Sequence, residues 1–500
     1  MIKQTLFTFF TLIACTSLFA ESAAEFRTDK HFEQIKSNPK RLEAFLYQMP
    51  KGGDLHNHES GSSFPENLLR YAKNDSLCIN RETFTTYTGS CSAEDLLNNA
   101  DADANFYHAI VDAWSLHEFV PGKESGHDHF FATFGKFDAL VRNHRGEILA
   151  EIANRAGKQN NLYLELMVTA DNNASGELGK SLGYHPDFAV MRDKLLSAPT
   201  FPSIVASVSS NITIDEQKKN KVLACDTKHA KKGCEVTIRY LYQVLREQAP
   251  EAVFAQLLTG FEAAGKDSRV VGINMVQPED GTISMQDYKL HMQMVSFLHK
   301  LYPNVRISLH AGELTKALVT PEGLTFHIND AVKVAGASRI GHGVDIANEN
   351  NYPVLLQDMA DKRVMVEINL SSNAGILEVK GKQHPLPLYM QYGVPVALST
   401  DDQGITLADL TTQYVLAAQE FELSYATLKN FSRNSMTYSF LPGKSLWQDA
   451  AYKQVVTECA VDTLGSSTLS KACSAFLRQN EKARTQWKLE RHFNKFESRF

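Results

Sequence analysis

The sequence predicts an α/β protein built on one (β/α)8 TIM-type barrel, with insertions after its first two strands and a helical C-terminal extension. Eight short apolar runs alternate with amphipathic helical stretches such as 285–301 and 353–362, a pattern typical of parallel strands joined by helices. Each run ends in polar residues, and the strand ends are where the active site of such a barrel lies. The eight runs are 53–58, 162–169, 236–241, 270–276, 306–313, 339–344, 364–370 and 394–402.

The less regular parts of the chain fit the same scheme. The run 236–241 has two interpretations, because its continuation YQVLREQ also fits a helix. Residues 74–123 and 197–233 exceed what a minimal barrel needs, and we interpret them as insertions above or beside it, with ordinary surface loops as the alternative. The tail 445–500 is predicted to be helical. Because such barrels reach about 250 residues or more as one unit, we predict a single domain over 21–500.

Composition and charge exclude several classes of protein. Of the 500 residues 43% are hydrophobic and 22% are charged, which excludes a disordered, collagen-like or coiled-coil chain. Lys and Arg total 51 against 57 Asp and Glu, so the net charge is −6 and nothing favours nucleic acid as a main partner. Beyond the amino terminus, no stretch is apolar enough to cross a membrane.

Residues 1–20 have the pattern of a secretory signal peptide. A lysine near the start precedes an apolar run, Leu6 to Ala14, and small residues follow near Ala20. The run is shorter than the roughly 20 residues of a membrane-spanning helix, and it lacks the polar face of a buried amphipathic one. We therefore expect export to the periplasm or the medium. The segment LIAC also resembles a bacterial lipobox, in which Cys15 would carry a lipid anchor.

The remaining six cysteines fall into three local couples: Cys78 with Cys91, Cys225 with Cys234, and Cys459 with Cys473. Six cysteines permit fifteen pairings, so local pairing is a hypothesis, with unrelated buried thiols as the alternative. An even number fits disulfides in an oxidising compartment. No C-x-x-C occurs, which disfavours a cysteine zinc site or a thioredoxin-like redox site.

Four strand-end residues form a candidate metal site. His56 and His58 end the first strand one residue apart, and alternate residues of a strand share a face. His310 ends the run RISLH, and Asp401 follows the run PVALST. Three imidazoles and one carboxylate suit a zinc ion that keeps an open position for water.

Further strand-end residues have the chemistry of acids and bases. Glu313 lies three residues past His310, where it can face a substrate without binding the metal, and His342 stands between two glycines. Each residue alone also fits a structural role, such as a core histidine, a turn or a helix cap. Their occurrence together at successive strand ends favours catalysis. By contrast, the second H-x-H, residues 127–129, follows no apolar strand, and we place it in a loop or helix start.

Several segments together resemble the adenosine deaminase family of metal-dependent aminohydrolases. They occur in the family's order along the barrel: MPKGGDLHNHESGS (49–62), SLHAGE (308–313), RIGHGV (339–344), VEINLSSN (366–373), LSTDDQG (398–404) and RNSMTYSFL (433–441). The leader and the cysteines make the chain similar to the secreted, growth-factor-type branch.

The resemblance implies one zinc ion per chain, bound by four residues: His56, His58, His310 and Asp401. It further implies that Glu313 delivers a proton to purine N1 and that His342 orients the zinc-bound water and helps deprotonate it for attack on C6. Asp402 would hydrogen-bond N7. The implied reaction converts adenosine, and with it deoxyadenosine, to the inosine product and ammonia, in purine nucleoside salvage.

The sequence departs from the family's pattern at three places, and the first two leave the identity of the aminopurine substrate undecided. Ser60 occupies the place of a ribose-contacting Asp or Glu, with Glu59 one residue earlier. Gln277 occupies the place of a glycine whose N–H meets purine N3. Asn369–Leu370 replaces a Cys-Pro pair, which we interpret as a packing change. Adenine, another 6-aminopurine or a 5′-modified adenosine is therefore the alternative substrate.

Other classes of function fit less well. A non-catalytic nucleoside binder or signalling protein would not need Glu313 or the intact ligand set. A cytidine-deaminase-type site requires H-x-E with P-C-x-x-C, which the chain lacks. A two-metal amidohydrolase needs a bridging lysine at a strand end, and none is present.

Overall fold

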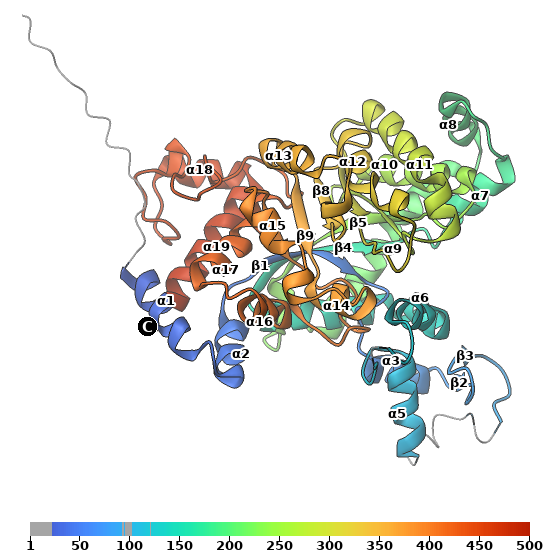
Figure 1. Cartoon of the computed structure of the whole chain (residues 1–500), viewed down its shortest axis with the longest axis horizontal. Coiled ribbons are helices and arrows are strands. Elements are labelled where there is room, and N and C mark those ends of the chain that lie inside the picture. Colours follow the sequence, from blue (N-terminus) through green and yellow to red (C-terminus); the bar gives the residue numbers. More distant parts are fainter. Residues whose placement is uncertain (1–22, 93–94, 96–102, 121) are drawn as a thin grey trace, which may run out of the picture.

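The computed structural model describes residues 23–92, 95, 103–120 and 122–500; the predicted signal peptide and Cys15 lie outside them. Eight parallel strands pair in the order β1-β4-β5-β6-β7-β8-β9-β10, and helices surround them (Figure 1). Their bounds are Gly52–His58 (β1), Asn161–Val168 (β4), Thr237–Leu245 (β5), Val270–Val276 (β6), Arg306–Ala311 (β7), Arg339–His342 (β8), Met365–Ile368 (β9) and Val396–Leu398 (β10). The predicted barrel and its eight strands are confirmed.

The sheet closes on itself between its first and last strands. Asn57 and Asp401 form a parallel bridge beyond the end of β10. The Asp401 N–H donates to His56 O at 2.8 Å, and the His58 N–H donates to Asp401 O at 3.4 Å. The barrel therefore closes at residues that the sequence assigns to the metal site.

The helical alternative for the continuation of the third run is wrong, because β5 extends unbroken through Leu245. Its neighbours β4 and β6 supply hydrogen bonds on both edges of the strand. The predicted helices 285–301 and 353–362 lie within α11 (Thr282–Leu301) and α13 (Tyr352–Lys362). His127 and His129 lie in the first turns of α6 (Gly126–Lys158), as expected for residues outside a strand.

The remaining helices cover the outside of the barrel or belong to the insertions and the C-terminal extension. They are α1 (Ala23–Ile35), α2 (Pro39–Gln48), α3 (Pro65–Asn74), α5 (Ala104–Ala113), α7 (Ala174–Leu182), α8 (Phe188–Ser197), α9 (Phe201–Val222), α10 (Pro250–Lys266), α12 (His327–Lys333), α14 (Leu370–Ile376), α15 (Leu386–Gln391), α16 (Leu410–Glu420), α17 (Tyr425–Thr437), α18 (Lys471–Gln479) and α19 (Glu481–Glu497). Helix α10 is buried on nearly all sides, because it packs against β5, β6 and four other helices.

The two predicted insertions form separate structures. The first, 74–123, contains the hairpin of β2 (Cys78–Ile79) and β3 (Thr86–Tyr87) and helix α5, which project from the barrel beside α3 and α6 (Figure 1). The second, 197–233, is mostly the helix α9, which packs along α6. A Cβ on Gly146 of α6 would lie 2.4 Å from the Lys218 Cβ, so this glycine permits the close approach of the two helices.

The six described cysteines form the three local disulfides that the sequence predicts. Cys225–Cys234 joins the end of α9 to the segment that leads into β5. Cys459–Cys473 lies in a small second core of the C-terminal extension, with Trp447 and Trp487. The extension is partly helical, as expected, and α19 packs on α17 and α1. Among the described residues, no helix is long and apolar enough to span a membrane.

The barrel interior contains a buried ion-pair network below the strand ends. The Arg339 guanidinium contacts Glu165 and Glu367, each at 2.6 Å, and all three side chains are at most 1% exposed. Ser308 donates a further hydrogen bond to Glu367 Oε1. Buried charges are tolerated only when paired, so this network fixes the side chain of Glu367, which also contacts His56 of β1.

Candidate metal centre and active site

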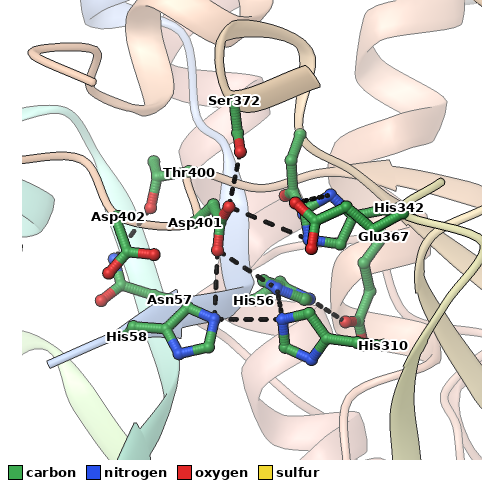
Figure 2. A network of polar contacts seen from close by, with 12 residues as sticks. His56, Asn57, His58, His310, His342, Glu367, Ser372, Thr400, Asp401 and Asp402 are labelled. Atoms are coloured by element: carbon green, nitrogen blue, oxygen red, sulfur yellow. Dashed lines mark hydrogen bonds and ion pairs between the residues drawn. The ribbon is translucent and has the colours of Figure 1, made fainter. Parts of the chain in front are cut away.

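The four predicted metal ligands converge at the closing seam of the barrel (Figure 2). The His310 Nε2 atom lies 3.1 Å from His56 Nε2 and 3.2 Å from His58 Nε2. Asp401 Oδ1 lies 3.4 Å from His56 Nε2 and 3.1 Å from His58 Nε2. All four side chains are buried. β1, β7 and the segment after β10 thus bring three nitrogens and one oxygen around a common point.

The second nitrogen of each imidazole is held by an oxygen on another strand. The three hydrogen bonds run from His56 Nδ1 to Glu367 Oε2 (2.6 Å), from His58 Nδ1 to Gln243 Oε1 (3.1 Å) and from His310 Nδ1 to Asn274 Oδ1 (2.7 Å). Because a carboxylate or amide oxygen only accepts, each Nδ1 carries the proton, and this assignment leaves three Nε2 lone pairs facing one another. Such outer hydrogen bonds orient metal-binding histidines.

This donor set fits a divalent metal ion. Three facing lone pairs and a carboxylate oxygen repel one another without a cation between them. The spacings of 3.1–3.4 Å match the edges of a tetrahedron around an ion bound at about 2.0–2.1 Å, the range of zinc–nitrogen and zinc–oxygen bonds. Asp401 is further oriented by Ser372, whose hydroxyl donates to Oδ2 at 2.6 Å.

Glu313 lies on a turn whose backbone N–H groups are bound by a second buried glutamate, Glu279. Glu279 accepts the N–H groups of Gly312 at 3.0 Å and Glu313 at 2.8 Å, and it accepts His327 Nδ1–H at 2.5 Å. Burial would raise the pKa of Glu279, but the hydrogen bond and charge of His327 and the charge of Arg246 lower it to about 2. The turn needs Gly312, whose φ is +77° and whose Cβ position lies 2.5 Å from Asp345 Oδ1.

The Glu313 side chain itself faces the metal-site cluster. Its Oε1 atom lies 3.5 Å from His342 Nδ1. Burial, with the charges of Asp401 and Glu279, raises the pKa of Glu313 well above its usual range. A carboxyl group in this setting retains a proton at neutral pH and can donate it.

A chain of hydrogen bonds fixes the protonation pattern of His342. The Leu386 N–H donates to His384 Nδ1 at 3.1 Å, so His384 Nε2–H donates to Asn373 Oδ1 at 3.0 Å. The Asn373 amide in turn donates to His342 Nδ1 at 2.9 Å. His342 Nδ1 is therefore an acceptor and Nε2 carries the ring proton; Nε2 lies 3.8 Å from Asp401 Oδ2. Burial lowers the pKa of His342 to about 3, which keeps the ring neutral.

Asn369 lies beside the same ring, and this corrects our interpretation of it as a packing change. Its amide nitrogen is 3.3 Å from His342 Nε2. Asn369 follows β9, at the N-cap of α14, and its amide group lies within hydrogen-bond distance of the imidazole.

A cavity of about 520 Å³ opens from the metal-site cluster towards α6. His58, His310, Glu313, Asp401 and Asp402 line its inner end. Its volume is in the range of small-molecule sites, which is about 300–1,000 Å³. The fold therefore brings the predicted acid, Glu313, and Asp402 to the wall of one ligand-sized space.

Ser60 and Gln277 are the two departures from the family's pattern that leave the identity of the substrate undecided. Both line this cavity. Gln277 has a φ of +81°, the left-handed conformation that favours glycine, in agreement with the glycine of the family's pattern. Its side-chain oxygen accepts the Glu247 N–H at 2.9 Å. The cost of this backbone conformation is thus offset by a local hydrogen bond.

Sequence reasoning missed the residues that support the site: Gln243, Asn274, Glu279, Glu367, Asn373 and Arg145. The sequence contains one feature that could have identified three of them. Gln243, Asn274 and Glu367 are polar residues inside otherwise apolar strands. A polar side chain at a buried strand position requires a partner. Glu279 lies in a loop and Asn373 in a short helix. The hydrophobic pattern of the sequence does not predict where such segments lie in the fold.

Comparisons with known proteins agree with this site. The sequence model described as "Adenosine deaminase" matches residues 122–448. The adenosine deaminase of Serratia proteamaculans is 26% identical over 227 residues, an alignment that covers 40% of this chain and 65% of the relative. The family match begins after β1, so His56 and His58 lie outside the matched residues, and the fold places them beside His310 and Asp401.

Solved structures share the fold over more of the chain. The Arabidopsis N6-mAMP deaminase superposes with a TM-score of 0.53 at 18% identity, covering 80% of this chain and 96% of its own. An adenine deaminase from Arthrobacter aurescens superposes with a TM-score of 0.52 at 16% identity, covering 79% and 94%. At these identities the likeness shows the barrel fold.

The metal-site geometry predicts that a chelator destabilises the protein. Removal of the ion leaves three lone pairs and a carboxylate facing one another, so we expect the Tm to fall by about 5 °C or more and to recover when zinc is restored. Differential scanning fluorimetry with and without chelator measures the shift.

A matched pair of variants locates the ion. His129→Ala, in the H-x-H outside the cluster, should keep the full chelator-dependent shift, whereas His310→Ala should lose it. An equal shift in both variants would place the ion elsewhere.

Proposed function

Because the chain belongs to the adenosine deaminase family, we propose that it hydrolyses adenosine and deoxyadenosine to the inosine product and ammonia, with one bound zinc ion. The observation that carries the proposal is the convergence of the His56, His58 and His310 nitrogens with Asp401 at the inner end of one cavity, which Glu313 also lines. The three nitrogens and one oxygen of this donor set are those that zinc prefers.

Zinc held by His56, His58, His310 and Asp401 would lower the pKa of water to about 7 and make hydroxide available at neutral pH. In the proposed reaction, water adds to C6 of the purine while the Glu313 carboxyl gives its proton to N1. His342 carries its ring proton on Nε2, so it donates a hydrogen bond to the attacking water and orients it, and does not take the water's proton. Of the two protons of that water, one restores the Glu313 carboxyl and the other passes to the amino group. The C6–N bond then breaks and the protonated amino group leaves as ammonia, so that adenosine and water give inosine and ammonia.

The chain's own residues position the purine and its proton donor. Asp402 lines the cavity beside the cluster and is proposed to hydrogen-bond N7. Glu279 holds the turn of Glu313, so the carboxyl meets the purine in a fixed orientation. Fixing a proton donor in place reduces the cost of bringing it to the reacting atom.

A second candidate is deamination of another 6-aminopurine, such as adenine or a 5′-modified adenosine. Ser60 favours it, since this position lines the cavity but offers no carboxylate to a ribose. Ammonia release measured across adenosine, deoxyadenosine, adenine and a 5′-modified adenosine separates the two candidates, because adenosine must be the better substrate for the first to hold.

We also propose that the protein is exported, to the periplasm or the medium, where it would act on extracellular nucleosides. Residues 1–20 carry the signal pattern, and three disulfides support an oxidising compartment. Mass spectrometry of the mature N-terminus tests this proposal. We expect cleavage near Ala20, or a lipidated Cys15 if the lipobox is used; a mature chain that retains Met1 contradicts export.

Substitution of the proton donor tests the reaction. Glu313→Gln should bind the metal normally but lose turnover by about 10²–10⁴-fold, because an amide cannot protonate N1. The ultraviolet change of adenosine, with inosine identified by chromatography, measures turnover, and elemental analysis measures the metal. Glu322→Gln, in the exposed segment that follows, is the control and should resemble the unsubstituted protein. Normal turnover in Glu313→Gln would refute its role.

Glu279→Gln should lower kcat by about tenfold or more while the metal content stays normal. The amide offers one acceptor where the carboxylate accepts two N–H groups, so the turn of Glu313 loses its fixed position. Asp280→Asn is the matched control, since this neighbouring carboxylate contacts His127 instead and should change kcat less than about threefold. Equal effects in the two variants would contradict the role of Glu279.

A further inference from the structure

The seam that closes the barrel contains little backbone pairing. Strand β10 is three residues long and pairs along its whole length with β9. Towards β1, the described residues form a single bridge, between Asn57 and Asp401, with backbone hydrogen bonds of 2.8 and 3.4 Å. One bridge constrains the chain at one point only, so side chains must fix the position of the segment that carries Asp401.

A bulge in β1 brings two polar side chains to the same side of the strand. Asp54 pairs with Leu164 and Asn57 with Leu166, so three steps along β1 face two steps along β4. Residues three apart in a regular strand point to opposite faces, and the extra residue of a bulge removes this alternation. Asn57 Nδ2 accordingly donates to Asp54 Oδ2 at 3.2 Å. The irregular strand thus presents a carboxyl and an amide group together.

These two side chains hold Thr400, the residue that precedes Asp401. The Thr400 N–H donates to Asp54 Oδ1 at 3.3 Å, and the Thr400 hydroxyl donates to Asp54 Oδ2 at 2.6 Å. Asn57 Nδ2 also donates to Thr400 Oγ1 at 2.8 Å (Figure 2). All three residues are at most 2% exposed, so water does not compete for these hydrogen bonds. We call Asp54, Asn57 and Thr400 the seam clamp.

The segment on the other side of Asp401 is held by the turn that follows β1. Ser62 Oγ donates to Asn57 Oδ1 at 2.9 Å, which links this turn to the seam clamp. The Gly61 carbonyl in turn accepts the Gly404 N–H at 2.9 Å. Asp401 therefore lies between two fixed points of the chain.

This support matters because Asp401 has an unfavourable backbone conformation. Its φ of +59° lies in the left-handed region, which residues other than glycine adopt at a cost in free energy. The hydrogen bonds of the seam clamp offset that cost while the protein folds. The Asp401 carboxylate is then already in place beside His56 and His58, and less ordering remains for the step in which a metal ion binds.

We infer that Asp54, Asn57 and Thr400 are positioning residues that set the affinity of the centre for its metal ion, because they hold Asp401 in its binding conformation. The inference rests on the zinc site of the proposed function and deepens it. Replacement of the groups that orient metal ligands typically weakens metal binding by about 10- to 100-fold.

Thr400→Val tests the inference, because valine keeps the shape of threonine but loses the hydroxyl that bonds Asp54 and Asn57. We expect the zinc Kd of the full chain, measured by competition with a chromophoric chelator, to rise by about 10- to 100-fold. Thr400→Ser keeps the hydroxyl, and its zinc Kd should stay within about threefold of that of the unsubstituted chain. Asn57→Ala breaks the seam clamp independently and should raise the zinc Kd by about tenfold.

Thr411→Val is the matched control. Thr411 is also buried, and its hydroxyl donates to Gln159 Oε1 at 3.0 Å. Gln159 precedes β4, so this contact lies at the opposite end of the barrel from the metal-site cluster. Loss of a buried hydrogen bond should lower the Tm of both valine variants. The zinc Kd of Thr411→Val should nevertheless stay within about threefold of that of the unsubstituted chain.

The outcomes separate this inference from the proposed function. An unchanged zinc Kd in Thr400→Val and Asn57→Ala, or an equal rise in Thr411→Val, overturns the inference and leaves the deaminase proposal standing. A chain whose zinc Kd depends on the seam clamp but that releases ammonia from no aminopurine supports the inference and overturns the deaminase proposal. An unsubstituted chain that binds no zinc overturns both.

Discussion

The backbone pairing that closes the barrel is the constraint on which the site depends. The hydrogen bonds that join the end of β10 to β1 are made by His56, His58 and Asp401 themselves. A closed sheet has no free edge to slip, so the register of this seam fixes three of the four candidate ligands relative to one another. The φ of +59° at Asp401 is a strained conformation that the closure maintains.

A second layer of polar groups holds the ligands from below. Glu367 links the seam to the interior network, because it accepts His56 Nδ1–H at 2.6 Å and contacts Arg339 at the same distance. Gln243 and Asn274 hold the other two imidazoles in the same way. These groups come from β5, β6 and β9, so nearly the whole circumference of the barrel contributes to one preorganised centre. The buried charges of the interior are thus part of the site's construction.

The second insertion contributes a charged contact at the edge of the site. Helix α9 would be a surface addition if it only covered α6, but it also brings Asp215 against Arg145. The cluster of Glu59, Arg145 and Asp215 therefore combines the end of β1, the long helix α6 and the insertion. The three disulfides lie in the first insertion, the second insertion and the C-terminal extension, which are the parts with the least barrel core to stabilise them.

Local pattern was enough to predict the strands and to select the four candidate ligands and Glu313 at their ends, because alternating apolar runs and their polar ends follow from near neighbours in the chain. It also indicated the cysteine couples, whose members are 9 to 14 residues apart. It could not place Glu279 under the Glu313 turn, Asn369 beside His342 or Asp215 against Arg145. These contacts join residues 27 to 70 positions apart. Their partners are set by how strands and helices pack, and the packing of the whole chain decides which buried polar groups meet.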